Sequence, residues 1–111
     1  MVPSLAITPY NPLMRKQDAI AGLAAQAEAV KAFGATSMYL FGSTARDRAK
    51  PDSDIDLFVD YDLNGQFSLV ELIGIKLLLE SRLQTTIDVT TRDSLDPLLR
   101  CSIETLAERI F

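Results

Sequence analysis

The chain contains no histidine and no tryptophan, and it has a single cysteine among its 111 residues. Without histidine it can form no Ser-His-Asp or Cys-His catalytic pair and no imidazole ligand set for zinc. The lone Cys101 excludes an internal disulfide and is typical of a reducing compartment, so we expect a cytoplasmic protein. Acid–base or metal chemistry must therefore depend on carboxylates, which favour hard cations such as Mg²⁺ or Mn²⁺.

Long apolar runs and a basic surplus are also missing. No apolar stretch approaches the roughly 20 residues that a membrane-spanning helix needs, and Pro3, Pro9 and Pro12 make the start of the chain a poor signal sequence. The formal net charge is −4, so direct binding to nucleic acid is not expected. The length and the 48% hydrophobic content predict one domain over 1–111, with 1–12 as an extended lead-in.

The negative charge is concentrated in one short segment, residues 47–62. Of the 15 acidic and 11 basic residues in the chain, six aspartates and two basic residues lie in this segment. The other 95 residues therefore contain nine acidic and nine basic side chains and are neutral. A charge imbalance confined to one segment indicates a candidate site there.

The hydrophobic pattern predicts a small α/β sandwich, in which helices flank a mixed sheet of about three strands. An alanine-rich run with helical spacing, β-branched runs and turn residues between them mark the elements. We expect helices at about 13–33, 69–83 and from Asp93 or Ser94 to Ile110, a short helix near 44–46, and strands at 37–41, 55–61 and 85–91.

The helix expected over 69–83 begins with a capping-box pair, Ser68 and Glu71, and is apolar on nearly every side. Such a helix is most simply a buried central helix. A domain of this size can rarely surround a helix completely, so a protein interface on part of its surface is the alternative.

The strand expected at 55–61 places two aspartates on one surface. Alternate side chains of a strand point to opposite faces, so Asp54, Asp56 and Phe58 share a face while the aliphatic residues between them face the core. A divalent cation relieves the repulsion between the two carboxylates and uses their oxygens as ligands. Asp88 also lies between two inward-facing aliphatic residues, so three carboxylates converge if the two strands are neighbours.

The turn before this strand offers a second chemical feature. Gly42-Ser43 follows an apolar strand, where glycine permits close backbone approach and N–H groups with a serine hydroxyl suit phosphate oxygens. Arg46 can add a charge-assisted contact. A phosphate cradle beside acidic metal ligands describes a site for phosphoryl or nucleotidyl transfer. The simpler alternatives are a solvated acidic face, a turn-capping Asp88, and an Arg46 that only pairs with a neighbouring aspartate.

These residues closely resemble the signature of the polymerase-β-like nucleotidyltransferases. The match consists of Gly42-Ser43-Thr44-Ala45-Arg46, a six-residue spacer, and Ser53-Asp54-Ile55-Asp56-Leu57-Phe58-Val59. In length the chain is similar to the minimal nucleotidyltransferases (MNT), often the antitoxin partners of small helical HEPN-domain proteins. The resemblance implies a Mg²⁺-dependent transfer of a nucleoside monophosphate, AMP from ATP, onto a hydroxyl of such a partner, as in MNT–HEPN toxin–antitoxin pairs.

The resemblance also implies roles for individual residues. Asp54 and Asp56 would hold the Mg²⁺ or Mn²⁺ ions that bridge the triphosphate. Asp88 would be the third carboxylate, a metal ligand and the general base for the attacking hydroxyl. The nucleotide would be contacted by Gly42, Ser43, Arg46 and Ser53.

One position departs from the family's pattern, because glycine usually follows the arginine of the first motif and Asp47 stands here instead. An added negative charge near a triphosphate weakens nucleotide binding. The alternative function is therefore a catalytically weak or inactive antitoxin that neutralises its partner by direct complex formation. A further alternative is a sensor that binds ATP without turnover.

Overall fold

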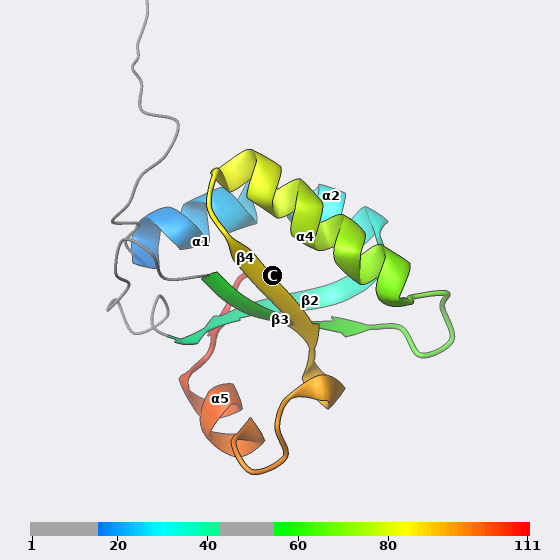
Figure 1. The fold of residues 1–111 in the computed structure, drawn as a ribbon, viewed down its shortest axis with the longest axis vertical. Helices are drawn as coiled ribbons and strands as arrows, with labels where there is room; N and C mark the ends of the chain where they lie inside the picture. Colours follow the sequence, from blue (N-terminus) through cyan, green and yellow to red (C-terminus); the bar gives the residue numbers. More distant parts are fainter. Residues whose placement is uncertain (1–15, 43–54) are drawn as a thin grey trace, which may run out of the picture.

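A computed structural model describes residues 16–42 and 55–111, which form a four-stranded sheet flanked by helices (Figure 1). This confirms the expected α/β sandwich. Predictions that fall on 1–15 or 43–54 lie outside the described residues. In chain order the elements are α1 (Lys16–Ala24), α2 (Ala27–Ala32), β2 (Ala35–Phe41), β3 (Ile55–Tyr61), α4 (Leu69–Leu83), β4 (Ile87–Thr91), the 3₁₀ turn η1 (Arg92–Ser94), α5 (Arg100–Leu106) and β5 (Glu108–Arg109).

The sheet is mixed, with the strand order β4-β3-β2-β5. β2 is antiparallel to both β3 and β5, whereas β3 and β4 are parallel. A parallel pair needs a crossover connection, and α4 provides it. In Figure 1, α1, α2 and α4 lie on one face of the sheet and α5 lies on the other.

The hydrophobic core lies between the sheet and the three helices α1, α2 and α4. Strand alternation sends every second residue of β2, β3 and β4 into it, and each helix contributes one apolar stripe. Burying each large aliphatic side chain contributes roughly 1.5–3 kcal/mol. The fully buried members are Ala19, Leu23, Val30, Met38, Leu40, Leu57, Val59, Ile75, Leu79 and Ile87.

Helix α4 has the predicted bounds and the predicted cap. The Ser68 N–H donates to Glu71 Oε1 at 2.7 Å, and Ser68 Oγ accepts from the Val70 N–H at 3.3 Å. Gln84 ends the helix in the left-handed conformation, with φ 55°. In the part of the chain that the structure describes, no helix is both long and apolar enough to cross a membrane.

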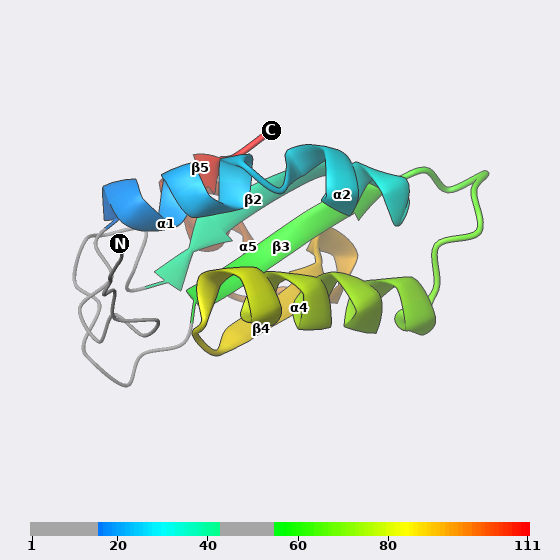
Figure 2. The same cartoon turned by 90° about the horizontal axis from the view of Figure 1, so that it is seen from above.

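The expectation of a buried central helix over 69–83 is wrong. Ile75 and Leu79 face the core, whereas the opposite stripe of α4 is exposed to between 46% and 73% of its full area. Figure 2 shows the reason, because α1 and α2 lie along one side of the helix layer and α4 along the other. Each helix in a single layer keeps one side in solvent. The exposed stripe consists of Leu69, Val70, Ile73 and Leu77.

The prediction of a single helix over 13–33 is also wrong, because the chain forms two helices, α1 and α2, with a turn between them. At the break the Gln26 N–H donates to Leu23 O, three residues back, at 3.0 Å. Both helices still bury the predicted apolar stripe, through Leu23 and Val30. Alanine-rich sequence favours continuous helix, and tertiary packing overrides so weak a preference.

The C-terminal prediction differs most from the structure. Neither Asp93 nor Ser94 caps the final helix, because both lie in η1 and α5 begins only at Arg100. The chain then returns to the sheet as β5, where the Ile110 N–H donates to Met38 O at 2.8 Å. A two-residue strand is too short to leave a sequence pattern. Three apolar residues of the expected helix, Leu98, Leu99 and Leu106, are exposed.

Candidate functional site

The face of the sheet that α5 occupies carries polar and aromatic side chains, and we call it the α5 face. On β3 it consists of the residues that alternate with the core residues, and strand register identifies their neighbours on β2 and β4. Across the three strands the α5 face comprises Ser37, Tyr39, Phe41, Asp56, Phe58, Asp60, Asp88 and Thr90.

Asp56 and Asp88 occupy paired positions on this face. They are Cα partners on the parallel strands β3 and β4, which places the two residues about 4.8 Å apart in the hydrogen-bonding direction. Asp56 is half-buried and Asp88 is exposed. β3 and β4 are neighbours, which is the condition under which the sequence pattern brings these carboxylates together, whereas Asp54 lies outside the described residues.

Gly42 follows β2 and lies directly beside the Asp56 carboxylate. Its φ of +78° belongs to the left-handed region that favours glycine. A Cβ at this position would overlap Oδ2 of Asp56. Two independent constraints, backbone conformation and space, therefore require glycine here. The other predicted nucleotide contacts, Ser43, Arg46 and Ser53, lie outside the described residues.

The described carboxylates fit part of a site for a hard divalent cation. Within 16–42 and 55–111, no group of three or more histidine, cysteine or acidic side chains is arranged to hold a metal ion. Asp56 and Asp88 supply two oxygen donors, and the third predicted ligand, Asp54, is outside these ranges. Oxygen donors suit Mg²⁺ and Mn²⁺ rather than softer metals, and a bound cation offsets the repulsion between adjacent carboxylates.

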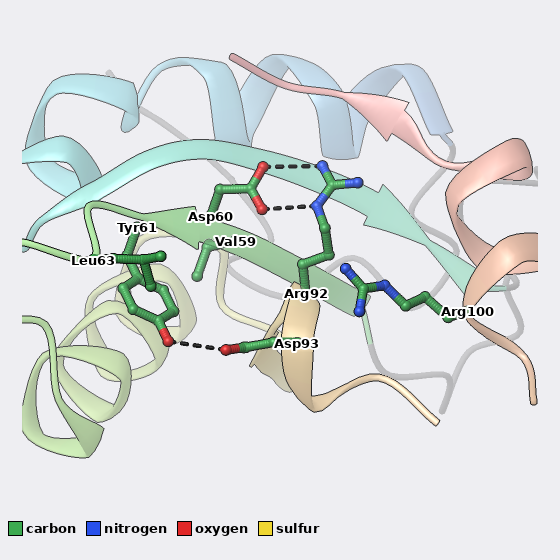
Figure 3. Close-up of a pocket in the computed structure, with 7 residues that line it drawn as sticks. All are labelled: Val59, Asp60, Tyr61, Leu63, Arg92, Asp93 and Arg100. Carbon is green, nitrogen blue, oxygen red and sulfur yellow. Dashed lines mark hydrogen bonds and ion pairs between the residues drawn. The ribbon is translucent and has the colours of Figure 1, made fainter. Parts of the chain in front are cut away.

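At the other end of the α5 face, Arg92 pairs with Asp60 of the sheet (Figure 3) and also bonds to α5. Its Nε donates to Asp60 Oδ1 at 2.7 Å and its Nη2 to Asp60 Oδ2 at 2.9 Å. Its Nη1 donates to Glu104 Oε2 of α5 at 2.7 Å. Ser37 Oγ also donates to Asp60, at 2.6 Å. The hydrogen bonds from Arg92 lower the pKa of both Asp60 and Glu104.

Aromatic rings support this arginine. The Arg92 guanidinium carbon lies 4.9 Å from the ring centroids of both Tyr39 and Phe58, and those two rings stack at 4.8 Å. Phe58 shares the face of Asp56, as the alternation predicts, and it is fully buried there. No local pattern predicts this cluster, because Arg92 and Asp60 are 32 residues apart in the chain.

A cavity of about 250 Å³ lies beside the Arg92–Asp60 pair. Tyr61 Oη donates to Asp93 Oδ2 at 3.0 Å across it (Figure 3). The cavity lies at the carboxyl ends of β3 and β4, whereas Asp56 and Asp88 each lie second from the amino end of their strand. It is therefore separate from the carboxylate pair. Its lining consists of Val59, Asp60, Tyr61, Leu63, Arg92, Asp93 and Arg100.

The sequence is similar to those of known proteins over much of its length. A model of the nucleotidyltransferase domain matches residues 23–110. A Methanocaldococcus jannaschii protein with the provisional name protein adenylyltransferase is 43% identical over 61 residues, 55% of this chain and 63% of that protein. Protein adenylyltransferase MntA of Thermococcus cleftensis is 36% identical over 63 residues, 57% of this chain and 62% of MntA. The matched region thus spans just under two thirds of each of these relatives.

Solved structures share the fold. A provisionally assigned minimal nucleotidyltransferase has a TM-score of 0.66 and 33% identity, over 80% of this chain and 93% of that chain. A chain from the complex of a tri-AMPylated Shewanella oneidensis HEPN toxin with its MNT antitoxin has a TM-score of 0.57 and 18% identity, over 79% and 68% of the two chains. The second likeness concerns the fold alone. From the domain match and the first structure, the chain belongs to the nucleotidyltransferase domain family and resembles its minimal members in sequence and structure.

Proposed function

We propose that the protein is a Mg²⁺-dependent protein adenylyltransferase, which moves AMP from ATP onto a hydroxyl of a partner protein. The observation that carries the proposal is the paired placement of Asp56 and Asp88, with Gly42 beside the Asp56 carboxylate. Family membership supports nucleotidyl transfer as the chemistry. The names of the two archaeal relatives support AMP as the group and a protein as the acceptor.

In this proposal Asp56 and Asp88, together with Asp54, hold the divalent cation through their carboxylate oxygens. The cation neutralises charge on the triphosphate and on the leaving group when it is bound. The oxygen of the acceptor hydroxyl forms a bond to the α-phosphorus, and Asp88 accepts the proton that this hydroxyl loses. The bond from that phosphorus to the bridging oxygen breaks, and pyrophosphate leaves. Mn²⁺ has the same ligand preference and is expected to substitute for Mg²⁺.

Gly42 has a separate role in the proposal. Because Gly42 has no side chain, the main chain after β2 can approach the triphosphate closely while Asp56 stays in place. Ser43, Arg46 and Ser53 are proposed as further contacts to the nucleotide. These three residues lie in the two segments that resemble the family signature.

We propose a small helical HEPN-type protein as the acceptor, so that the two form a toxin–antitoxin pair in the cytoplasm. The support is a protein of the same fold, the MNT antitoxin from Shewanella oneidensis, solved in complex with a HEPN toxin that carries AMP. We propose that residues 1–111 act in this pair as one domain.

The test follows label from ATP radiolabelled at the α-phosphate to a co-purified HEPN partner, with mass spectrometry to detect added AMP. Wild type is expected to label the partner only with a divalent cation present. Asp56→Asn should lower the rate by about 100-fold or more, since it removes a charged ligand. Asp62→Asn makes the same change on an exposed loop residue and should transfer normally.

Undiminished transfer by Asp56→Asn would contradict the assigned ligand. A partner that is silenced without gaining AMP would instead identify the protein as a binding antitoxin. ATP binding without pyrophosphate release would identify a nucleotide sensor.

A further inference from the structure

The main chain of Ile87, the residue before Asp88, is held by two side chains of α4. Lys76 Nζ donates to Ile87 O at 2.9 Å, and the Ile87 N–H donates to Glu80 Oε2 at 3.0 Å. Lys76 and Glu80 are themselves joined at 2.8 Å. We call this closed ring of three interactions the Lys76–Glu80 clamp.

The clamp occupies the outer edge of the sheet. β4 is an edge strand and pairs only with β3 in the described sheet. In a parallel pair, alternate residues bond to the neighbouring strand and those between point outward. Thr86 O accepts from the Ile55 N–H at 3.0 Å, so the groups of Ile87 point away from β3. Lys76 and Glu80 satisfy these groups as an additional strand would.

The clamp acts directly next to the carboxylate pair. The Ile87 side chain is fully buried in the core, and both of its main-chain polar groups are bonded to α4. Asp88 follows at once and points to the opposite face, in register with Asp56. The buried side chain of Ile87 and its two main-chain hydrogen bonds therefore fix the direction in which the Asp88 side chain leaves the strand.

An ordinary surface ion pair on another helix provides a contrast. Lys31 and Glu28 of α2 are 3.3 Å apart, and the Glu28 side chain is 91% exposed. Such pairs contribute little to stability. The Lys76 and Glu80 side chains are 39% and 27% exposed, and the hydrogen bond from Lys76 lowers the pKa of Glu80. Glu80 is therefore charged at neutral pH, and the clamp differs from the α2 pair by its two hydrogen bonds to a strand.

We propose that Lys76 and Glu80 are positioning residues for Asp88, and that they keep its carboxylate in register with Asp56 for binding a divalent cation. The catalytic meaning of this inference rests on the proposed function. Cation binding by the pair is measurable without ATP or a partner, so the two proposals can be tested separately.

The experiment measures Mn²⁺ binding to the nucleotide-free protein by electron paramagnetic resonance. Lys76→Met keeps the length of the side chain and removes the donor to Ile87 O, so the apparent Kd for Mn²⁺ should rise about 3- to 10-fold. Lys76→Arg, which keeps a cationic donor, should restore most of the affinity. Lys31→Met makes the same change in the α2 pair and should bind Mn²⁺ as wild type does.

Hydrogen exchange separates positioning from a general loss of stability. In Lys76→Met the amides of β4 should exchange faster, while those of β2 remain protected as in wild type. Glu80→Gln retains an oxygen that can accept from the Ile87 N–H, and it should weaken Mn²⁺ binding in the same direction by a smaller factor. It also serves as the test variant if Lys76→Met does not fold.

Wild-type Mn²⁺ affinity in folded Lys76→Met would overturn the positioning role. An equal loss in Lys31→Met, or equal Mn²⁺ affinity in wild type and Asp56→Asn, would overturn it as well. A protein that binds Mn²⁺ through this pair but transfers no AMP would instead refute the proposed function and leave the positioning role intact.

Discussion

Asp56 and Asp88 are Cα partners on parallel strands, and both lie on the face of the sheet that α5 occupies. Neighbouring carboxylates repel each other. A cation that binds between two carboxylates held in register removes this repulsion, and its binding therefore stabilises the fold. Gly42 borders the same pair, because a Cβ there would overlap the Asp56 carboxylate.

ATP binding should require a divalent cation. Residues 47–62 have a net charge of −4, and a triphosphate adds more negative charge, so the bare nucleotide is repelled. By isothermal titration calorimetry, ATP should bind at least about 10-fold more weakly after metal removal, equivalent to roughly 1.4 kcal/mol. Equally tight binding with excess chelator would contradict this expectation.

Gly42→Ala should impair both stability and cation binding, whereas Gly34→Ala should impair stability alone. Both glycines have positive φ, +78° and +110°, so alanine costs roughly 1–2 kcal/mol at either position. Only at Gly42 does the new Cβ meet Asp56, whereas at Gly34 it approaches the Phe67 ring. Denaturant unfolding measures the stability, and Mn²⁺ titration separates the variants. Equal Mn²⁺ affinity in the two variants would argue against crowding of Asp56.

Two leucines of α4 should differ sharply in their contribution to stability. Leu79 is fully buried, whereas Leu77 is 59% exposed. Leu79→Ala should therefore cost about 2–5 kcal/mol in the free energy of unfolding. Leu77→Ala should change it by less than about 0.5 kcal/mol, because alanine is at least as favourable in a helix. The free energy of unfolding is measured in urea for both variants. A similar decrease in both would show that the exposed stripe is covered in solution.

The Arg92–Asp60 pair should make stability fall at acid pH. Arg92 lowers the pKa of folded Asp60 below its ordinary value of 3.8. As the pH falls, the unfolded chain therefore takes up this proton first, and folding loses stability. The stabilisation by the Arg92–Asp60 pair is complete at pH values above the pKa of Asp60 in the unfolded chain. It is lost as the pH falls through the lower pKa of Asp60 in the folded protein. Urea unfolding at a series of pH values follows this loss.

The matched variant for this prediction is Asp60→Asn. At neutral pH it should be less stable than wild type by about 1–3 kcal/mol, because it removes charge-assisted hydrogen bonds. That difference should narrow as the pH falls below 3.8, the ordinary pKa of this carboxyl. Arg92→Met removes the other half of the pair and should show the same narrowing. A difference that stays constant down to the acid transition would contradict the sign of the pKa shift.

Local patterns predicted the elements that depend on local chemistry. The alternation of apolar and polar residues gave the bounds of β3, and the pair of Ser68 and Glu71 correctly marked the start of α4. Alternation also placed Asp56 and Asp88 on outward faces of their strands. The break between α1 and α2 was missed, because no residue there forbids a helix and packing decides where it ends.

The sequence by itself therefore determined the α/β class, the family signature and the carboxylates on the outward faces of two strands. Only the tertiary structure decided that Asp56 and Asp88 stand in register, because register depends on hydrogen bonds between strands that are distant in the chain. The same holds for the Arg92–Asp60 pair and for the clamp that joins Lys76 and Glu80 to Ile87. Each depends on which elements become neighbours, and that is set by burial of the whole core rather than by any local pattern.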